Sequence, residues 1–312
     1  MARYNSILEL IGNTPLVALD ALSPNPRVRI WAKLEGGNPG GSVKDRIALE
    51  MVEDAERRGV LSPGDTILEP SSGNTGIGLA LVARLRGYRL RIVLPENVSV
   101  ERRQILEIFG AEVTPSPAEE GSNGAIRVAE KLAADDPTLV MLFQYGNPAN
   151  TAAHYKTTGP EILRDCPEID VFVGGLGTSG TLMGVGSYLK EHKPGVRVVA
   201  VEPPAGELVQ GLRSLDDGFV PPIFDPGILD RKFIVRPRES IVWTRRLLNE
   251  CGLFTGISAG AVVAGAAKMA AAIDEGTIVT LIPDGGWKYL SSGAWTDDLD
   301  VVEERAKTIN YW

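Results

Sequence analysis

The chain has 312 residues, of which 44% are hydrophobic and 23% are charged, as expected for a soluble globular protein of about two domains. Its formal net charge of −8 disfavours nucleic acids and anionic membranes as partners, because both require a basic surface. Two cysteines and two histidines are too few for a disulfide framework or a zinc site. The start, MARYNSILEL, lacks the hydrophobic core of a signal peptide, so we expect a cytoplasmic protein.

Short apolar runs that suggest β-strands alternate along the chain with amphipathic runs that suggest helices. The strand-like runs are RIWAKLE (29–35), TILEP (66–70), LRIVLP (90–95), VFVGG (171–175), RVVAVEP (197–203) and TIVTLIP (277–283). Between them, VERRQILEIFG (100–110) and GAIRVAEKLAADDP (124–137) have helical spacing. The alternation predicts an α/β protein with mostly parallel sheets covered by helices.

Three other segments bear on the domain organisation of the chain and on whether it spans a membrane. The polar, turn-rich segment 143–162 is the best candidate for a domain seam. The run ISAGAVVAGAAKMAAAI (257–273) is too short to span a bilayer comfortably, and its small residues predict a tightly packed buried helix. The tail from about Asp297 could be a docked helix or a mobile flap.

Lys44 stands where a glycine-rich loop, NPGGSVKDR (38–46), turns into a run with helical spacing. A lysine amine attacks a carbonyl only when it is uncharged, so its pKa must fall. The positive end of a helix dipole and burial in a cleft would both lower that pKa. Taken alone, however, Lys44 is better explained as a surface lysine at a helix start.

Three strand ends run into glycine-rich segments, which are EPSSGNTGIGLA (69–80), VGGLGTSGTLMG (173–184) and FTGISAGAVVAG (254–265). In a parallel sheet such turns gather at the carboxyl ends of the strands and aim backbone N–H groups at anions. GLGTSGT suits a phosphate, and SSGNT suits a carboxylate. Any one loop could be an ordinary tight turn, but three loops together with Lys44 favour a phosphorylated aldehyde cofactor, and pyridoxal phosphate fits.

Two short patterns point to other functions. Gly175, Gly177 and Gly180 have G-x-G-x-x-G spacing and Glu202 ends the next strand, so an NAD-dependent oxidoreductase is a competing hypothesis. It leaves the lysine and the SSGNT loop unexplained. Residues 256–260 match G-x-S-x-G, but both histidines precede the serine, which disfavours a serine hydrolase. No P-loop motif is present in the sequence.

Seven motifs, in this order, resemble those of the cysteine synthase family, the fold-type II pyridoxal-phosphate enzymes. They are IGNTPLV (11–17), GSVKDR (41–46), EPSSGNTG (69–76), LPENVSVERRQILEIFGAEV (94–113), NPANTAAHYKTTGPEI (147–162), GLGTSGTLMG (175–184) and GISAGA (256–261). The resemblance implies a tryptophan synthase β-like α/β fold with two domains. Residues 1–36 plus 147–312 would form a larger cofactor-binding domain, and residues 37–146 a smaller, mobile substrate-binding domain. It also implies a homodimer.

The resemblance implies a role for each matching residue. Lys44 would be the catalytic residue and bind the cofactor as an internal aldimine, Asn74 would hydrogen-bond its ring hydroxyl, and Ser258 would face its pyridine nitrogen. The cofactor phosphate would be bound by Gly177, Thr178, Ser179, Gly180 and Thr181. The substrate carboxylate would be received by Ser71, Ser72, Gly73, Thr75 and Gln144.

The reaction that the resemblance implies is a β-replacement. The freed amine of Lys44 would remove the α-proton of an amino acid, the β-substituent would leave to give an aminoacrylate, and a sulfur nucleophile would add at Cβ. A serine, unlike an aspartate, cannot keep the pyridine nitrogen protonated. The ring is then a weaker electron sink, which favours elimination over transamination.

The segment GELVQGLRSLDDGFVPPIFD (206–225) resembles the actinobacterial branch of the family, which uses O-phosphoserine. In that branch an arginine binds the substrate phosphate, and here that residue is Arg213. Alternatively, Arg213 pairs with Asp216 or Asp217 on a surface loop. The same branch takes sulfur from a thiocarboxylated small carrier protein rather than from free sulfide, and an aromatic tail, here INYW (309–312), enters its active site.

One segment departs from the family pattern, since PDGGWKYLSSG (283–293) stands where many cysteine synthases have a PSSGERYLS-like sequence. We therefore expect a cysteine synthase that prefers O-phosphoserine over O-acetylserine. Cystathionine β-synthase and serine/threonine dehydratase are alternatives within the same chemistry. An NAD-dependent oxidoreductase and a catalytically silent binding protein are alternatives from other classes.

Overall fold

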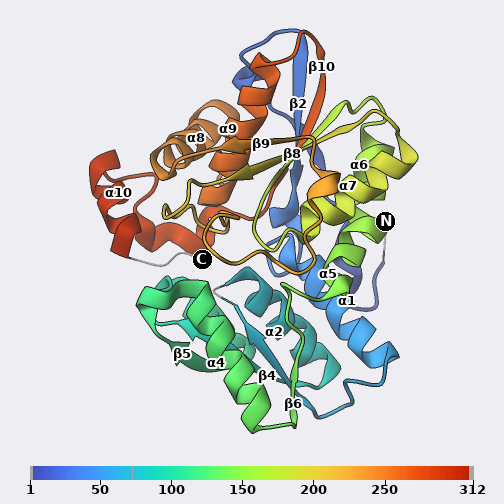
Figure 1. The fold of residues 1–312 in the computed structure, drawn as a ribbon, viewed down its shortest axis with the longest axis vertical. Helices are drawn as coiled ribbons and strands as arrows, with labels where there is room; N and C mark the ends of the chain where they lie inside the picture. Colours follow the sequence, from blue (N-terminus) through green and yellow to red (C-terminus); the bar gives the residue numbers. More distant parts are fainter. Residues whose placement is uncertain (1–2, 72, 309–312) are drawn as a thin grey trace.

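The computed structural model describes residues 3–71 and 73–308, and within them it contains two β-sheets (Figure 1). One sheet has the order β1 (Leu16–Ala18), β2 (Val28–Leu34), β10 (Gly276–Ile282), β7 (Val171–Gly175), β8 (Arg197–Glu202) and β9 (Arg231–Ile234). The other has the order β5 (Glu112–Ser116), β4 (Arg89–Pro95), β3 (Thr66–Pro70) and β6 (Leu139–Met141). Every described pair is parallel except β1 with β2, so the predicted α/β class is confirmed.

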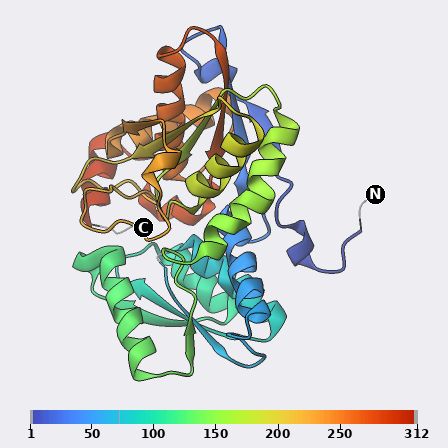
Figure 2. The same cartoon turned by 45° about the vertical axis from the view of Figure 1, so that its right-hand side comes forward.

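Helices cover both sheets. The α-helices are α1 (Lys44–Arg57), α2 (Asn74–Arg86), α3 (Val100–Phe109), α4 (Gly121–Asp135), α5 (Pro148–Ala153), α6 (Gly159–Asp165), α7 (Gly180–His192), α8 (Pro237–Cys251), α9 (Ile257–Ala271) and α10 (Leu299–Thr308). Shorter helical segments are η1 (Ile7–Leu10), η2 (Asp20–Leu22), η3 (Glu35–Gly37), η4 (Ala118–Glu120), η5 (His154–Thr158, a π-helix), η6 (Pro226–Ile228) and η7 (Gly286–Ser292). In Figure 1 and Figure 2, α2 and α4 lie on the four-stranded sheet, and α1 and α5 lie side by side, with residues of both in the core of that sheet.

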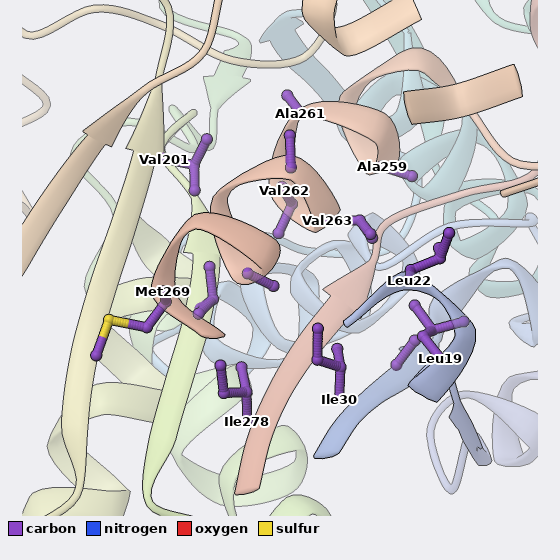
Figure 3. Close-up of a cluster of buried hydrophobic side chains, with 14 of the residues drawn as sticks. Leu19, Leu22, Ile30, Val201, Ala259, Ala261, Val262, Val263, Met269 and Ile278 are labelled. Atoms are coloured by element: carbon purple, nitrogen blue, oxygen red, sulfur yellow. The ribbon is translucent and has the colours of Figure 1, made fainter. Parts of the chain in front are cut away.

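The helix α9 forms the centre of the larger core (Figure 3). Its Ala, Val and Met side chains pack against residues of β2, β8 and β10, including Ile30, Val201 and Ile278. A Cβ on Gly265 would lie 2.3 Å from Val201 Cγ2, so only glycine allows this close approach to the sheet. The buried helix predicted over 257–273 is therefore confirmed, and within the described residues we find no helix long and apolar enough to cross a membrane.

The tail folds as the docked helix that was one of its two predicted forms. In α10, Val302 is buried with Ile241, Ile257 and Ala294. The last four residues, 309–312, which carry the predicted aromatic flap, lie outside the described residues.

We propose the domain boundaries that the family resemblance implies, 1–36 plus 147–312 and 37–146, because they assign each sheet to one unit. The four-stranded sheet is built from strands within 66–141, and the six-stranded sheet from strands within 16–34 and 171–282. The boundary at 147 is crossed by packing, since Ala149 and Ala153 of α5 belong to the core of the four-stranded sheet.

A buried ionic network connects segments of the two proposed domains. Arg46 of α1 donates from Nε to Glu35 Oε2 at 2.7 Å and from Nη1 to Glu161 Oε1 at 2.7 Å. Lys33 of β2 lies 2.8 Å from Glu161 Oε2. Burial would raise the pKa of Glu161, but its hydrogen bonds to Arg46 and Lys33 hold that pKa at about 2. The network therefore keeps the buried carboxylate of Glu161 charged.

Replacing Arg46 with methionine should lower the free energy of unfolding by about 3–5 kcal/mol, because Glu35 and Glu161 would remain buried without their main cation. Urea denaturation of the wild type and the variant measures this difference. Arg57→Met is the matched control, since Arg57 pairs with Glu50 at 3.1 Å on the surface. Its replacement should lower the free energy of unfolding much less than that of Arg46. Equal effects of the two substitutions would contradict a structural role for the network.

Candidate active site

A single cavity is lined by twelve of the residues that the sequence singled out. They are Lys44, Ser71, Gly73, Asn74, Thr75, Gln144, Gly177, Thr178, Ser179, Thr181, Arg213 and Ser258. Gly180 begins α7 between two lining residues but does not line the cavity itself. Ser72 lies outside the described residues. The loops after β3 and β7 meet here as predicted, because the carboxyl ends of parallel strands face the same edge of each sheet. The third glycine-rich segment, 254–265, follows helix α8 and not a strand, so that part of the prediction is wrong, and its Ser258 reaches the cavity from the start of α9.

Lys44 is the first residue of α1, as the sequence predicted. Its backbone N–H donates to Ser42 Oγ at 3.2 Å. Burial lowers the pKa of the Lys44 amine, while the carboxylates of Asp284 and Glu35 act in the opposite direction. The amine therefore combines access to the cavity with a larger neutral fraction than an ordinary lysine has.

The loop before α7 forms a cradle for an anion. Ser179 has φ = +69°, and its Oγ is buried with no hydrogen-bond partner among the described residues. A Cβ on Gly180 would lie 1.9 Å from Asn150 Oδ1, so glycine is required where α7 begins. Asn150 in turn donates to Thr178 Oγ1 at 3.0 Å. The backbone N–H groups at the start of a helix and an unpartnered buried hydroxyl together suit a phosphate.

His154 contacts Thr181 at the start of α7, and the sequence did not single out this histidine as a site residue. Its Nε2 lies 3.1 Å from Thr181 Oγ1, and its Nδ1 lies 2.9 Å from Thr158 Oγ1. Burial, followed by the charge of Lys44, lowers the pKa of His154 well below its ordinary value, so the ring is neutral. It lies in a π-helix, a local distortion that often marks functional sites.

The loop after β3 presents hydroxyl and amide groups on the other side of the cavity. Ser71 Oγ accepts from the backbone N–H of Gly76 at 3.1 Å. Thr75 Oγ1 donates to Gln144 Oε1 at 2.6 Å. Glu69 holds Gln144 in place by accepting its backbone N–H at 3.0 Å, and burial raises the pKa of Glu69 to about 8. The arrangement suits a carboxylate, because it offers several neutral donors within one turn.

Arg213 is buried, with 8% of its surface exposed, and its guanidinium packs against two aromatic rings. It is 5.3 Å from the ring centre of Tyr145 and 4.6 Å from that of Phe219. Its Nη1 donates to Asn123 Oδ1 at 3.1 Å. Among the described residues no carboxylate pairs with it, so the alternative pairing with Asp216 or Asp217 is wrong.

The structure also tests the dinucleotide-binding pattern. The glycines 175, 177 and 180 do lie between β7 and α7, but Glu202 is fully buried away from the cavity. Glu202 lies 2.5 Å from Lys232 Nζ and accepts the backbone N–H of Leu215 at 3.2 Å. It stabilises the packing of β8 and is not free to bind a ribose, so this pattern gives no support to an oxidoreductase.

Comparisons with known proteins agree with this geometry. A family model described as "Pyridoxal-phosphate dependent enzyme" matches residues 7–284. The chain is 41% identical to "Cysteine synthase B" of Salmonella typhimurium over 295 residues, which cover 94% of this chain and 97% of the relative. The crystal structure of O-ureido-L-serine synthase has a TM-score of 0.89 and 41% identity, covering 95% of this chain and 97% of that one. The crystal structure of cysteine synthase from Entamoeba histolytica has a TM-score of 0.89 and 35% identity, covering 98% and 96%.

Proposed function

The chain belongs to the pyridoxal-phosphate dependent enzyme family, and from this premise we propose that it is a cysteine synthase that prefers O-phosphoserine to O-acetylserine. Cysteine synthase chemistry with pyridoxal 5'-phosphate follows from the family and from relatives of that name at about 41% identity over nearly the whole chain. The preference for O-phosphoserine rests on one observation, the buried guanidinium of Arg213 with no carboxylate partner among the described residues.

The residues around the cavity fit pyridoxal phosphate. The unpartnered Oγ of Ser179 and the helix start that follows it are the features expected of a phosphate site. We propose that Lys44 holds the cofactor covalently, that Asn74 meets its ring hydroxyl and that Ser258 faces its pyridine nitrogen. The phosphate would be held by Gly177, Thr178, Ser179, Gly180 and Thr181. When bound, the cofactor supplies an electron sink for the pair left on Cα of an amino acid.

The protein's own contribution begins with binding and proton transfer. We propose that Ser71, Ser72, Gly73, Thr75 and Gln144 receive the substrate carboxylate. This would orient the α-proton toward Lys44 Nζ, which accepts it as general base and later returns it. Burial favours this role, because it lowers the pKa of the amine toward the operating pH.

Arg213 would bind the leaving group. When the Cβ–O bond of O-phosphoserine breaks, phosphate leaves with the bonding electron pair, and the sulfur nucleophile then forms the Cβ–S bond of cysteine. A planar guanidinium suits the charged phosphate and offers little to a neutral acetyl ester. Asn123 and the two aromatic rings hold the guanidinium at the cavity wall. The Arg213 side chain is therefore already ordered before the substrate binds.

We further propose that the enzyme is a cytoplasmic homodimer that uses sulfide or a thiocarboxylated small carrier protein as its sulfur source. The family resemblance supports the dimer and the carrier protein. The small number of cysteines supports a reducing compartment.

The test of the proposed function is a comparison of leaving groups. With sulfide in excess, the purified protein should release phosphate from O-phosphoserine with a kcat/KM at least about tenfold above that for acetate release from O-acetylserine, as expected for a charge-assisted hydrogen bond. Cysteine should form in equal amount. Faster turnover of O-acetylserine would contradict the preference, and no cysteine from either substrate would contradict the function.

A further inference from the structure

Asn74 is held on both sides by two charged residues from the segment that departs from the family pattern. Lys288 Nζ donates to Asn74 Oδ1 at 2.8 Å, and Asn74 Nδ2 donates to Asp284 Oδ2 at 2.8 Å. Both charged residues are buried, with 7% of Lys288 and 1% of Asp284 exposed. The cation and the anion thus flank a single amide at the edge of the cavity.

These contacts fix the orientation of the amide. An ammonium can only donate hydrogen bonds and a carboxylate can only accept them, so the Asn74 side chain cannot turn over without losing both contacts. Asp284 uses only one N–H of Nδ2. The second N–H is left for another acceptor, and Asn74 lines the cavity.

Lys288 also reaches the loop that carries Lys44. Its Nζ donates to the carbonyl oxygens of Gly40 and Gly41 at 3.0 and 3.1 Å. Three acceptors therefore satisfy all three N–H groups of one buried ammonium. Asp284 accepts a further hydrogen bond from the hydroxyl of Tyr289 and is joined by a β-bridge to Ser42.

We propose that Asp284 and Lys288 are positioning residues that hold the Asn74 amide with Nδ2 facing the ring hydroxyl of pyridoxal phosphate. Lys288 simultaneously fixes the loop before Lys44 against the start of α2. The inference rests on the proposed contact between Asn74 and the cofactor. It assigns a role to the sequence PDGGWKYL, which the proposed reaction itself does not use.

The test compares cofactor binding by Lys288→Met, Asp284→Asn and Lys288→Arg. Titration with pyridoxal phosphate should show about tenfold weaker binding by the first two variants, together with a changed visible absorption maximum of the bound cofactor. Lys288→Arg should retain most of the affinity, because arginine also supplies several charged donors. Lys190→Met is the matched control, since Lys190 pairs with Asp230 at 2.9 Å away from the cavity and should leave cofactor binding unchanged.

Three results would overturn the proposal. Wild-type affinity and absorption in both Lys288→Met and Asp284→Asn would show that the amide needs neither partner. An equal loss in Lys288→Arg and Lys288→Met would show that a cation is not what the site requires. If Asn74→Ala left affinity and absorption unchanged, the contact between Asn74 and the cofactor would be wrong, and that part of the proposed function would fail with it. Because Asp284→Asn keeps the side-chain shape, it remains informative should Lys288→Met fail to fold.

Discussion

Replacing Lys44 with alanine is expected to reduce cysteine formation by roughly 10⁴-fold or more, the largest effect of any single substitution in this protein. One amine is proposed to hold the cofactor and to move the α-proton, so the substitution removes both contributions together. Among the described residues no second lysine lines the cavity, and Lys288, which lies close to it, donates to Gly40, Gly41 and Asn74. Cysteine production from O-phosphoserine and sulfide measures the loss.

Chemical trapping separates this role from a merely structural one. Borohydride reduction of the wild-type holoenzyme, followed by peptide mapping, should find the cofactor attached to the peptide that contains Lys44. Lys190→Ala is the control and should be labelled like the wild type, because Lys190 lies in a partly exposed ion pair with Asp230. A label on another lysine, or near-normal turnover by Lys44→Ala, would exclude Lys44 as the reactive amine.

The larger elements of the fold could be predicted because their sequences carry a strong local signal. All six apolar runs predicted as strands correspond to β2, β3, β4, β7, β8 and β10. The strands β1, β5, β6 and β9 could not be predicted, since they have three to five residues and are half-buried or exposed over most of their length. Short edge strands depend on the neighbouring strand for their hydrogen bonds and need no apolar run of their own.

The candidate site was predictable where a loop carries its own chemistry. The glycine-rich turns and Lys44 meet in one cavity because strand ends and helix starts are local features that the topology brings together. The flanking groups were not predictable in this way. Lys288 and Asn74 are 214 positions apart in the sequence, and Arg213 and Asn123 are 90 positions apart. No local sequence pattern can therefore predict either contact.

Glu202 shows the opposite failure, in which a local pattern suggests the wrong partner. Its place at the end of a strand after a glycine-rich turn is typical of a ribose-binding carboxylate. The structure excludes this role, because Lys232 and the backbone N–H of Leu215 already bind the Glu202 carboxylate inside the packed sheet. A motif states which group is available, whereas packing determines what that group faces.

Arg213→Ala should reduce kcat/KM for O-phosphoserine by about 10- to 100-fold, the range expected when a charge-assisted hydrogen bond to a phosphate is lost. Turnover of O-acetylserine should change by less than about threefold, because the acetyl group carries no charge for the guanidinium to bind. Initial rates with both substrates at saturating sulfide measure the two effects on the same preparation.

Two further variants determine whether the loss comes from the charge or from its placement. Arg213→Lys keeps the charge but loses the planar donor pair, so it should recover only part of the activity with O-phosphoserine. Asn123→Ala keeps the guanidinium but removes the acceptor that orients it, 3.1 Å from Nη1, and should cause a smaller loss confined to O-phosphoserine. Equal losses with both substrates in Arg213→Ala would mean that Arg213 stabilises the cavity wall against Tyr145 and Phe219 instead of binding the leaving group. The specificity would then have to come from another group.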